Sequence, residues 1–219
     1  MKSTIELDDP QLLALPQSPL AREVIDLVTT AASPALSNHS FRSYLFARLA
    51  ARERGLVAVD DYDPELLFCA CALHDIGLTP TGDRGHRFEV DGADVAAELL
   101  TRRGFAAAQV DSVWQAIALN TSVGIVERRG VVCELTLAGV SLDFVGAPFI
   151  SDGVAARVHE RYPRLAIGKT LADAIVEQAK AKPEKAPLFS MPAQVLQQRS
   201  SPPHLAEVEQ LAREGRWGQ

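Results

Sequence analysis

The sequence predicts an all-α protein, and three observations support this prediction. Apolar residues recur at helical spacing over most of the chain, residues typical of helix starts and stops bracket these segments, and alternating runs typical of β-strands are unconvincing. Hydrophobic residues make up 47% of the 219 residues, a normal share for a globular protein. We therefore expect a packed helical domain rather than a disordered chain.

The clearest helix starts are two cap-and-proline pairs. Ser18 followed by Pro19 is typical of an N-cap and a first helical residue, because proline at that position loses no hydrogen bond. Asp63-Pro64 gives the same signal before Leu66–Leu73, a run without a polar residue that predicts a helix buried on all sides. Further helices are expected over residues 39–54, 90–103, 107–119, 131–145, 152–160 and 169–181, with a turn-rich loop over residues 79–86.

The C-terminal region has a different composition. Five prolines fall between Pro183 and Pro203, and this stretch cannot be a single helix because proline removes helical hydrogen bonds. We therefore expect a helical domain over residues 1–182, followed over residues 183–219 by an irregular proline-rich arm with a short helix near residues 204–214. The arm is expected to pack on the core or on a partner subunit, which leaves a homo-oligomer open.

Charge and composition exclude several classes of function. The net charge of −6, without a basic block, argues against nucleic-acid binding. No apolar run reaches the length of a membrane span, and the acidic N-terminus lacks the apolar stretch of an export signal. The three cysteines stand at irregular spacing and are expected to be buried apolar residues. We therefore expect a cytoplasmic protein that acts on a small molecule, without nucleic-acid or membrane partners.

Histidine and aspartate stand at three predicted helix ends, as His39, His74-Asp75 and Asp143. Each has an ordinary structural explanation when taken alone, such as a cap or a polar helix end. Burying Asp75 beside an apolar helix is costly, however, unless a cation compensates its charge. Together the four residues are predicted to bind one divalent metal, with zinc as the first choice and iron or manganese as alternatives. Two histidines and two aspartates leave open positions for a water that becomes a nucleophile near neutral pH.

The order of these residues resembles the HD-domain superfamily, which is named for its His…His-Asp…Asp ligands. The matching strings are NHSFRSYLFARLA, ALHDIGLT and LAGVSLDFVG. The strings SFRSYLF, RFEVDGADVAAELL and VWQAIALNTSVGIVERRG resemble more narrowly the cyanamide hydratase-like branch. The resemblance covers roughly residues 18–180 and implies a helical, metal-dependent hydrolase fold. For the branch it implies addition of water to a small nitrile-like molecule, cyanamide to urea.

Two positions depart from the patterns that the resemblance implies. Phosphohydrolases of the superfamily usually carry a lysine soon after the His-Asp pair, whereas here neither Lys nor Arg occurs until Arg84. The branch usually has a histidine where Asn120 stands. Asparagine can hydrogen-bond water but cannot carry a proton near pH 7, so an altered mechanism, substrate or level of activity follows if that histidine takes part in catalysis.

Several residues near the predicted ligands are candidates for further roles. The catalytic candidates are Asp75, Glu89 and Asn120, and the substrate-binding candidates are Thr79, His86 and Thr121. Glu89 or its neighbour Asp91 is expected to orient a ligand histidine or to transfer a proton. The alternatives are a solvated loop and helix start for these acidic residues, helix caps for the threonines and an exposed loop position for His86. Four aromatic residues are expected in the core, and two further histidines at the surface: Phe41, Phe88, Trp114, Phe144, His159 and His204.

Three hypotheses for the function follow from this sequence. The first is a metal-dependent hydratase or hydrolase that acts on a small neutral nitrogenous substrate, nitrile- or amide-like, such as cyanamide. The second is a phosphohydrolase in which Arg42, Arg84 and Arg87 hold the phosphate. The third is a metal-stabilised binding domain without activity. A neutral, apolar cavity favours the first, a positively lined one the second, and a metal site without a cavity the third.

Overall fold

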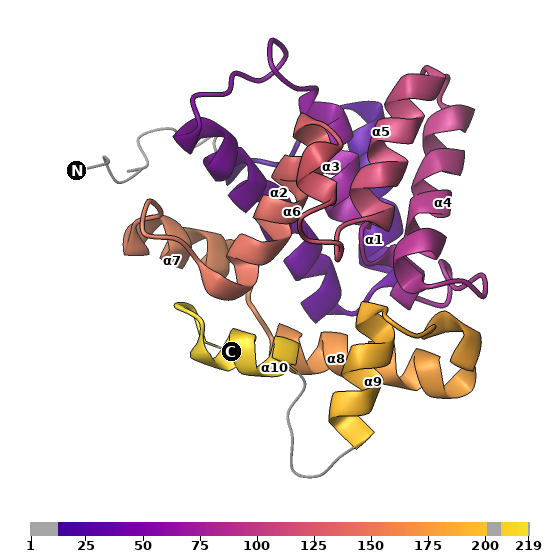
Figure 1. The fold of residues 1–219 in the computed structure, drawn as a ribbon. Helices are drawn as coiled ribbons and strands as arrows, with labels where there is room; N and C mark the ends of the chain where they lie inside the picture. Colours follow the sequence, from indigo (N-terminus) through magenta and orange to yellow (C-terminus); the bar gives the residue numbers. More distant parts are fainter. Residues whose placement is uncertain (1–12, 201–206, 219) are drawn as a thin grey trace.

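The computed structural model describes residues 13–200 and 207–218 and confirms the all-α prediction for them (Figure 1). These residues form ten α-helices joined by turns and short 3₁₀ helices, without a β-strand among them. Figure 1 shows α2, α3 and α6 in the middle of a bundle, with α4 and α5 along one side and α8 to α10 as a layer below. Within the described part of the chain, no helix is long and apolar enough to cross a membrane.

Cap-and-proline pairs begin three of the helices. The hydroxyl of Ser18 accepts a hydrogen bond from the third residue of α1, which spans Pro19–Ala31. Ser33 caps α2 in the same way, so this helix spans Pro34–Glu53 and begins five residues before the predicted start at His39. Ser33-Pro34 is the same signal as Ser18-Pro19, and it places His39 in the second turn of α2 instead of at the helix end.

The central helix is α3, which spans Pro64–Leu73 and is capped by Asp63. Every residue from Leu66 to Leu73 is buried, as the apolar run predicts. Cys69 and Cys71 on this helix are free and buried, and burial raises the pKa of the Cys71 thiol to about 12. These thiols therefore serve as small apolar residues of the core.

The remaining bundle helices pack around α3. The 3₁₀ turn η2 (Ile76–Leu78) leads from α3 into the loop before α4 (Phe88–Arg102), and α5 (Ala107–Ala118) follows. Helix α6 (Val131–Val145), preceded by η3 (Val126–Arg128), lies against α2. A β-carbon on Gly139 of α6 would lie 2.1 Å from the carbonyl oxygen of Ser43 of α2, so only glycine allows the two helices this approach. Helix α7 (Asp152–Arg161) completes the bundle.

The C-terminal region is more regular than the sequence predicts. It contains α8 (Ile167–Ala181), η4 (Pro183–Lys185), α9 (Met191–Ser200) and α10 (Glu207–Glu214). The predicted irregular arm therefore contains a helix, because Pro192 falls in the first turn of α9, where proline breaks no hydrogen bond. Helices α9 and α10 contact α8, and α10 also contacts α6. The predicted boundary between residues 182 and 183 stays a prediction.

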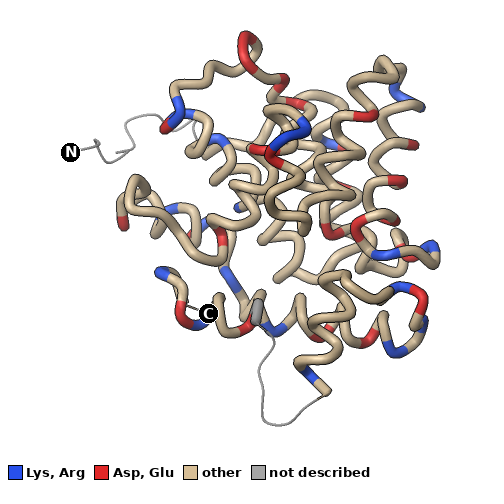
Figure 2. Tube along the Cα trace, viewed as in Figure 1, with Lys and Arg blue, Asp and Glu red and all other residues tan. Residues whose placement is uncertain are grey.

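A buried ion-pair network fastens η4 to the bundle. The ammonium group of Lys185, which is 1% exposed, lies 2.6 Å from carboxylate oxygens of both Asp83 and Asp91. Asp91 is fully buried and also accepts hydrogen bonds from the backbone N–H groups of Arg84 and His86. The network fixes the loop before α4 and the start of the C-terminal layer together. Elsewhere, acidic and basic residues are interspersed along the trace (Figure 2).

Candidate metal centre

Three of the four predicted metal ligands converge in the structure. Nε2 of His39 lies 3.2 Å from Nε2 of His74, and Oδ2 of Asp75 lies 3.3 Å from Nε2 of His74. All three side chains are buried, and Oδ2 of Asp75 has no hydrogen-bond donor among the described residues. Two imidazole nitrogens and an unsatisfied carboxylate oxygen that face one another fit a divalent cation such as zinc.

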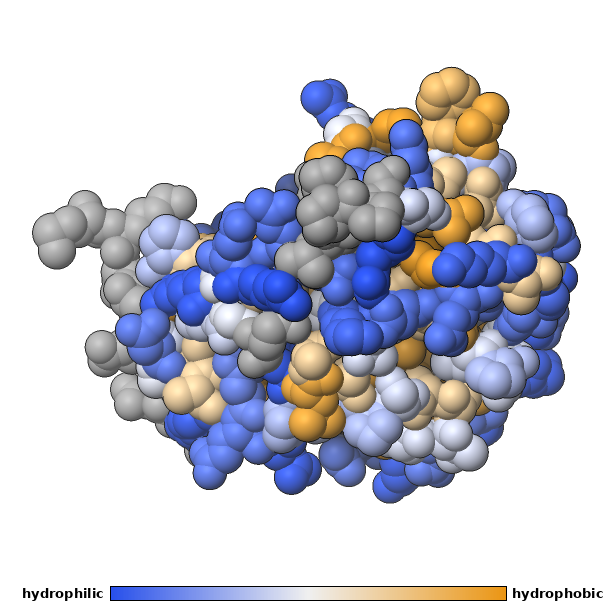
Figure 3. All heavy atoms as spheres, turned by 90° about the horizontal axis from the view of Figure 1, so that it is seen from below, coloured by the Kyte–Doolittle hydropathy of each residue, from blue (hydrophilic) through white to orange (hydrophobic). Residues whose placement is uncertain are grey.

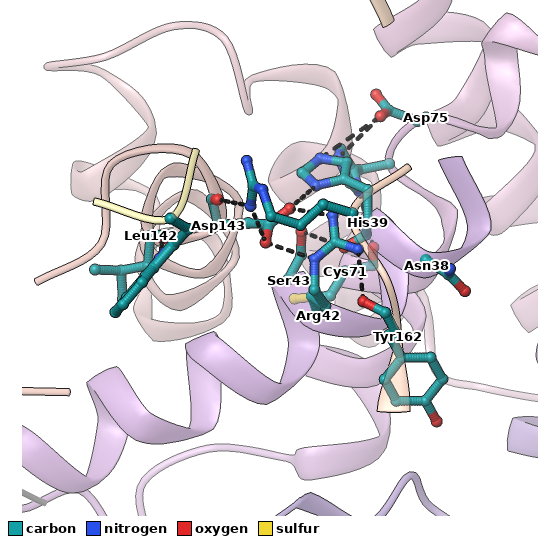
Figure 4. A network of polar contacts seen from close by, with 12 residues as sticks. Asn38, His39, Arg42, Ser43, Cys71, Asp75, Leu142, Asp143 and Tyr162 are labelled. Carbon is teal, nitrogen blue, oxygen red and sulfur yellow. Dashed lines mark hydrogen bonds and ion pairs between the residues drawn. The ribbon is translucent and has the colours of Figure 1, made fainter. Parts of the chain in front are cut away.

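Hydrogen bonds on the far side of each imidazole orient Nε2 toward the cluster. Nδ1 of His74 lies 2.8 Å from the carbonyl oxygen of Cys71, which only accepts, so Nδ1 carries the proton and Nε2 keeps its lone pair. Nδ1 of His39 lies 2.6 Å from a carboxylate oxygen of Asp143 and is oriented in the same way. Both histidines therefore present the nitrogen that a metal requires, and Figure 4 shows the contact between His39 and Asp143.

The charges around the cluster favour a cation. Burial lowers the pKa of His39, against the hydrogen bond to Asp143, and this favours the neutral ring that binds metals. At His74 the lowering by burial is outweighed by the charge of Asp75, so the pKa of this ring is raised. Asp75 thus draws positive charge into the cluster, and a metal ion supplies that charge without protonating His74.

The sequence predicts Asp143 as the fourth ligand, but the structure gives its carboxylate other partners. The guanidinium group of Arg42 donates to both carboxylate oxygens, at 2.7 Å each, and Arg164 lies 3.2 Å from one of them. Asp143 is fully buried, and although burial alone would raise its pKa, Arg42 and His39 hold that pKa well below its ordinary value. In this arrangement Asp143 lies behind His39 and orients it, outside the cluster of facing ligand atoms.

Arg42 is itself held at the centre of this network. It is fully buried on α2, and its Nη1 donates to the backbone carbonyl oxygens of Tyr162 and Pro163, at 3.0 Å each (Figure 4). On the sequence alone, Arg42 is a candidate only for holding a phosphate. Arg42 stands three residues after His39, on the same helix face. A charged residue on the buried face of a helix requires a buried partner, and this pattern could have indicated its role in the network.

The three converging ligands open onto a cavity of about 320 Å³. Its described lining is mostly apolar, and its polar members are the ligands themselves, hydroxyl groups and amides, without a lysine or arginine among them. The lining comprises His39, His74, Asp75, Phe88, Asn120, Thr121, Val123, Leu137, Val140, Ser141, Phe144, Leu171, Met191, Gln194, Val195, Gln198 and Leu211. Phe88 and Phe144 are buried as predicted, but they also face this cavity.

Comparison with known proteins agrees with this geometry. The family model of the HD domain matches residues 36–178, which is more than half of the chain. The chain belongs to the HD domain family. Two relatives, the cyanamide hydratases DDI2 and DDI3 of Saccharomyces cerevisiae, are each 27% identical over 158 residues, covering 68% of this chain and 68% of the relative. These matches confirm the resemblance to the cyanamide hydratase-like branch and support a metal-dependent hydrolase or hydratase.

Two further candidates lie in the cavity of this HD domain. Asn120 is buried in the wall, and its side-chain NH₂ donates to the carbonyl oxygen of Ile117. The Thr121 hydroxyl, also in the wall, donates to Glu89 at 2.8 Å. Glu89 is fully buried and paired with Arg87, and it is linked to the cavity through Thr121 instead of lining it. The HD domain therefore has a buried carboxylate one hydrogen bond away from its cavity.

Three other candidates have structural roles away from the cavity. The Thr79 hydroxyl donates to the carbonyl oxygen of Ile76 and closes the turn after η2, and Thr79 is not among the described residues that line the cavity, so the structure does not support the substrate-binding role predicted for it. The side chain of His86 is 67% exposed, lies near Asp91 and is also outside the described lining, so the structure does not support the predicted contact with substrate either. Asp91 pairs with Lys185 and organises the loop instead of orienting a ligand histidine.

Only one of the two histidines expected at the surface lies among the residues that the structure describes. His159 is partly buried, with its ring centroid 5.6 Å from that of Trp217, so the expectation of a surface position is wrong for it. His204 lies outside the described residues.

Proposed function

We propose that this HD domain is a hydratase or hydrolase that adds water to a small uncharged nitrogenous substrate of the nitrile or amide type. The observation that carries the proposal is the cluster of His39, His74 and Asp75 at a cavity whose described lining has no cationic side chain. The cyanamide hydratase activity named for the two yeast relatives supports it. Cyanamide itself is the first substrate to test.

In this proposal His39, His74 and Asp75 hold the metal, with zinc as the first choice and iron or manganese as alternatives. When bound there, such a metal supplies an activated water and polarises the carbon that is attacked. Asp143 and Arg42 contribute by fixing the ring of His39, which is the role of the carboxylates that commonly hydrogen-bond metal-binding histidines. Three protein ligands leave coordination positions open toward the cavity.

The residues of the wall divide the remaining tasks. Asn120 presents a side-chain amide in the cavity wall, so we propose that it hydrogen-bonds to the polar end of the substrate and does not transfer a proton. Glu89 is the carboxylate proposed to hold or return a proton, because the Thr121 hydroxyl links it to the cavity. Nitrile hydration moves a proton onto the substrate nitrogen, which this short relay can deliver.

The phosphohydrolase alternative lacks the cations that it requires. Arg42 is engaged with Asp143, Arg87 with Glu89, and Arg84 with Glu98. None of these arginines is among the residues that line the cavity. Apart from the metal, a phosphate group would therefore meet apolar side chains, hydroxyl groups and amides among the described residues, without the lysine or arginine that would help to neutralise it. The cavity above the ligands likewise counts against a purely structural metal site.

The test is turnover of cyanamide by the purified protein loaded in turn with zinc, iron and manganese. Urea release is expected, and His74→Ala should abolish both turnover and stoichiometric metal binding, because His74 offers one of the facing nitrogens. His86→Ala is the matched control, since this exposed histidine should leave both properties unchanged. Absence of turnover across the metals and a panel of nitriles and amides would refute the proposal, and hydrolysis of p-nitrophenyl phosphate or nucleotides would favour the phosphohydrolase.

A further inference from the structure

The cavity is much larger than cyanamide requires. Its volume of about 320 Å³ corresponds to about ten water molecules at the volume that each takes in the liquid, ~30 Å³. Cyanamide has three non-hydrogen atoms. Bound at the metal ligands, it would leave most of the cavity to water held against apolar walls, and displacing such water by apolar groups favours binding.

The apolar wall is continuous over several helices. Helix α6 contributes Leu137, Val140 and Phe144, which recur at the spacing of one helix face. Opposite elements contribute the other large apolar residues of the lining: Phe88, Val123, Leu171, Met191, Val195 and Leu211. Among the described residues that line the cavity, the polar groups are those of the predicted metal ligands, Asn120-Thr121, Ser141 and two glutamines. Such a lining suits a molecule with one polar end and an apolar body.

The C-terminal layer supplies part of this wall. Met191, Gln194, Val195 and Gln198 come from α9, and Leu211 from α10. All five follow residue 178, where the match to the HD domain family model ends. Seen from below, the face that includes this layer carries separate hydrophobic areas among hydrophilic residues (Figure 3). The metal ligands therefore belong to the family core, whereas a large part of the wall that contacts the substrate body lies outside it.

We propose, building on the proposed function, that the substrate is a substituted nitrile or cyanamide with an uncharged, apolar substituent and about ten non-hydrogen atoms in all. The C≡N group lies at the metal ligands and is hydrated, water adding its oxygen to carbon and its hydrogens to nitrogen, to give an amide or a substituted urea. The substituent lies against α6, α9 and α10. A carboxylate or ammonium group on the substituent would be buried without a partner, so charged analogues are excluded.

The expected selectivity can be worked from burial of methylene groups. Burial of each methylene group stabilises the bound substrate by an amount that corresponds to about a fourfold increase in a binding or rate ratio. A butyl or benzyl substituent should therefore raise kcat/KM over that of cyanamide by at least tenfold. The experiment compares cyanamide, butylcyanamide, benzylcyanamide and carboxymethylcyanamide on the metal-loaded protein. The order expected is benzyl or butyl, then cyanamide, then carboxymethyl.

Cavity-filling variants link this selectivity to the wall. Val140→Phe narrows the cavity, whereas Val145→Phe places the same substitution on α6 at an exposed residue that does not line it. Val140→Phe should lower kcat/KM for benzylcyanamide at least tenfold while that for cyanamide changes little, and Val145→Phe should change neither. Leu211→Trp on α10 is a second narrowing variant, chosen because its partly exposed side chain tolerates enlargement if Val140→Phe fails to fold.

The outcomes separate this inference from the proposed function. If cyanamide is turned over better than both apolar analogues, the inference is overturned and the proposed function remains intact. If neither nitriles nor amides are turned over, the proposed function fails, and calorimetry with urea and benzylurea as uncharged probes still tests the cavity. Benzylurea binding at least tenfold more tightly than urea, and weakened by Val140→Phe, would support the apolar ligand class; equal binding would overturn it.

Discussion

Replacement of Arg42 by methionine tests the network behind the metal ligands. Two ion pairs join α2 to α6, and they differ chiefly in burial. The pair of Arg42 with Asp143 is fully buried, whereas the side chains of Arg54 and Glu134, 2.9 Å apart, are 38% and 40% exposed. Arg54→Met is therefore a matched control, with the same residue type, a position at the C-cap of the same helix and the same partner helix.

The two substitutions should differ in cost by several-fold. Removing one member of a buried ion pair destabilises a protein by about 3–5 kcal/mol, because the other charge stays buried. Arg164 and His39 still contact Asp143 after Arg42→Met, so the lower end, about 3 kcal/mol, applies. An exposed pair such as that of Arg54 contributes about 0–1 kcal/mol. Methionine preserves most of the aliphatic packing in both variants, which isolates the charge.

Urea unfolding of the metal-free protein, followed by circular dichroism, measures both costs. With a slope of about 1–3 kcal/mol per molar urea, Arg42→Met should lower the midpoint by roughly 1–3 M, and Arg54→Met by much less. Metal affinity, measured by chelator competition, should fall about 10–100-fold in Arg42→Met alone, because Asp143 then orients His39 less firmly. Equal stabilities and equal metal affinities in the two variants would refute the assigned role of the network.

Three further predictions concern other parts of the molecule. Lys185→Met should lower the free energy of unfolding by about 3 kcal/mol, measured in urea, because it leaves the buried carboxylate of Asp91 without its lysine partner. Because Lys185 lies just before the segment that leads to α9, KM should also rise, and an unchanged unfolding curve would contradict this prediction. Burial lowers the pKa of His159 to about 4, so between pH 6.5 and about 4 this histidine is protonated in the unfolded chain but neutral in the folded one. The free energy of unfolding should therefore decline as the pH falls through this window, and it should decline less steeply in His159→Gln. Gly139→Ala should lower the melting temperature because its β-carbon meets the backbone of α2, whereas Gly153→Ala, with open space around it, should leave that temperature unchanged or raise it.

Most of the bundle could be predicted from the sequence because its signals are local. The apolar run of α3, its Asp63 cap and the spacing along α6 require no knowledge of other elements. The errors are also local. The apolar spacing predicts the start of α2 at His39, five residues late, although Ser33-Pro34 is a cap-and-proline pair like Ser18-Pro19. The prolines after residue 182 predict an irregular arm in place of α9, although Pro192 falls in the first turn of that helix, where proline is accepted.

The convergence of His39, His74 and Asp75 could be predicted, but the separate position of the Asp143 carboxylate could not. An adjacent His-Asp pair directly after an apolar helix indicates, from the sequence alone, that a carboxylate is buried there. The role of Asp143 depends on Arg42, which lies 101 residues away in the chain and 2.7 Å away in space. The sequence alone does not distinguish an aspartate that binds a metal from one whose carboxylate pairs with a guanidinium group. The same limit explains Thr79 and His86, whose nearness in sequence to the ligands did not place them in the cavity.

The arrangement separates what holds the metal from what selects the substrate. His39 is oriented from α6 through Asp143, and His74 by the carbonyl group of Cys71 of α3, so neither of these orienting groups lies on α9 or α10. The cavity above them is closed in part by α9 and α10. Both helices contact α8, α10 also contacts α6, and the Lys185 network fastens the segment before α9 to the bundle. Substitutions in α9 or α10 can therefore change the substrate body that is accepted while the metal ligands keep their geometry, whereas a change at Arg42 or Asp143 affects every substrate alike. Selectivity measured across a substrate series, compared with metal affinity in the same variants, distinguishes these two kinds of residue.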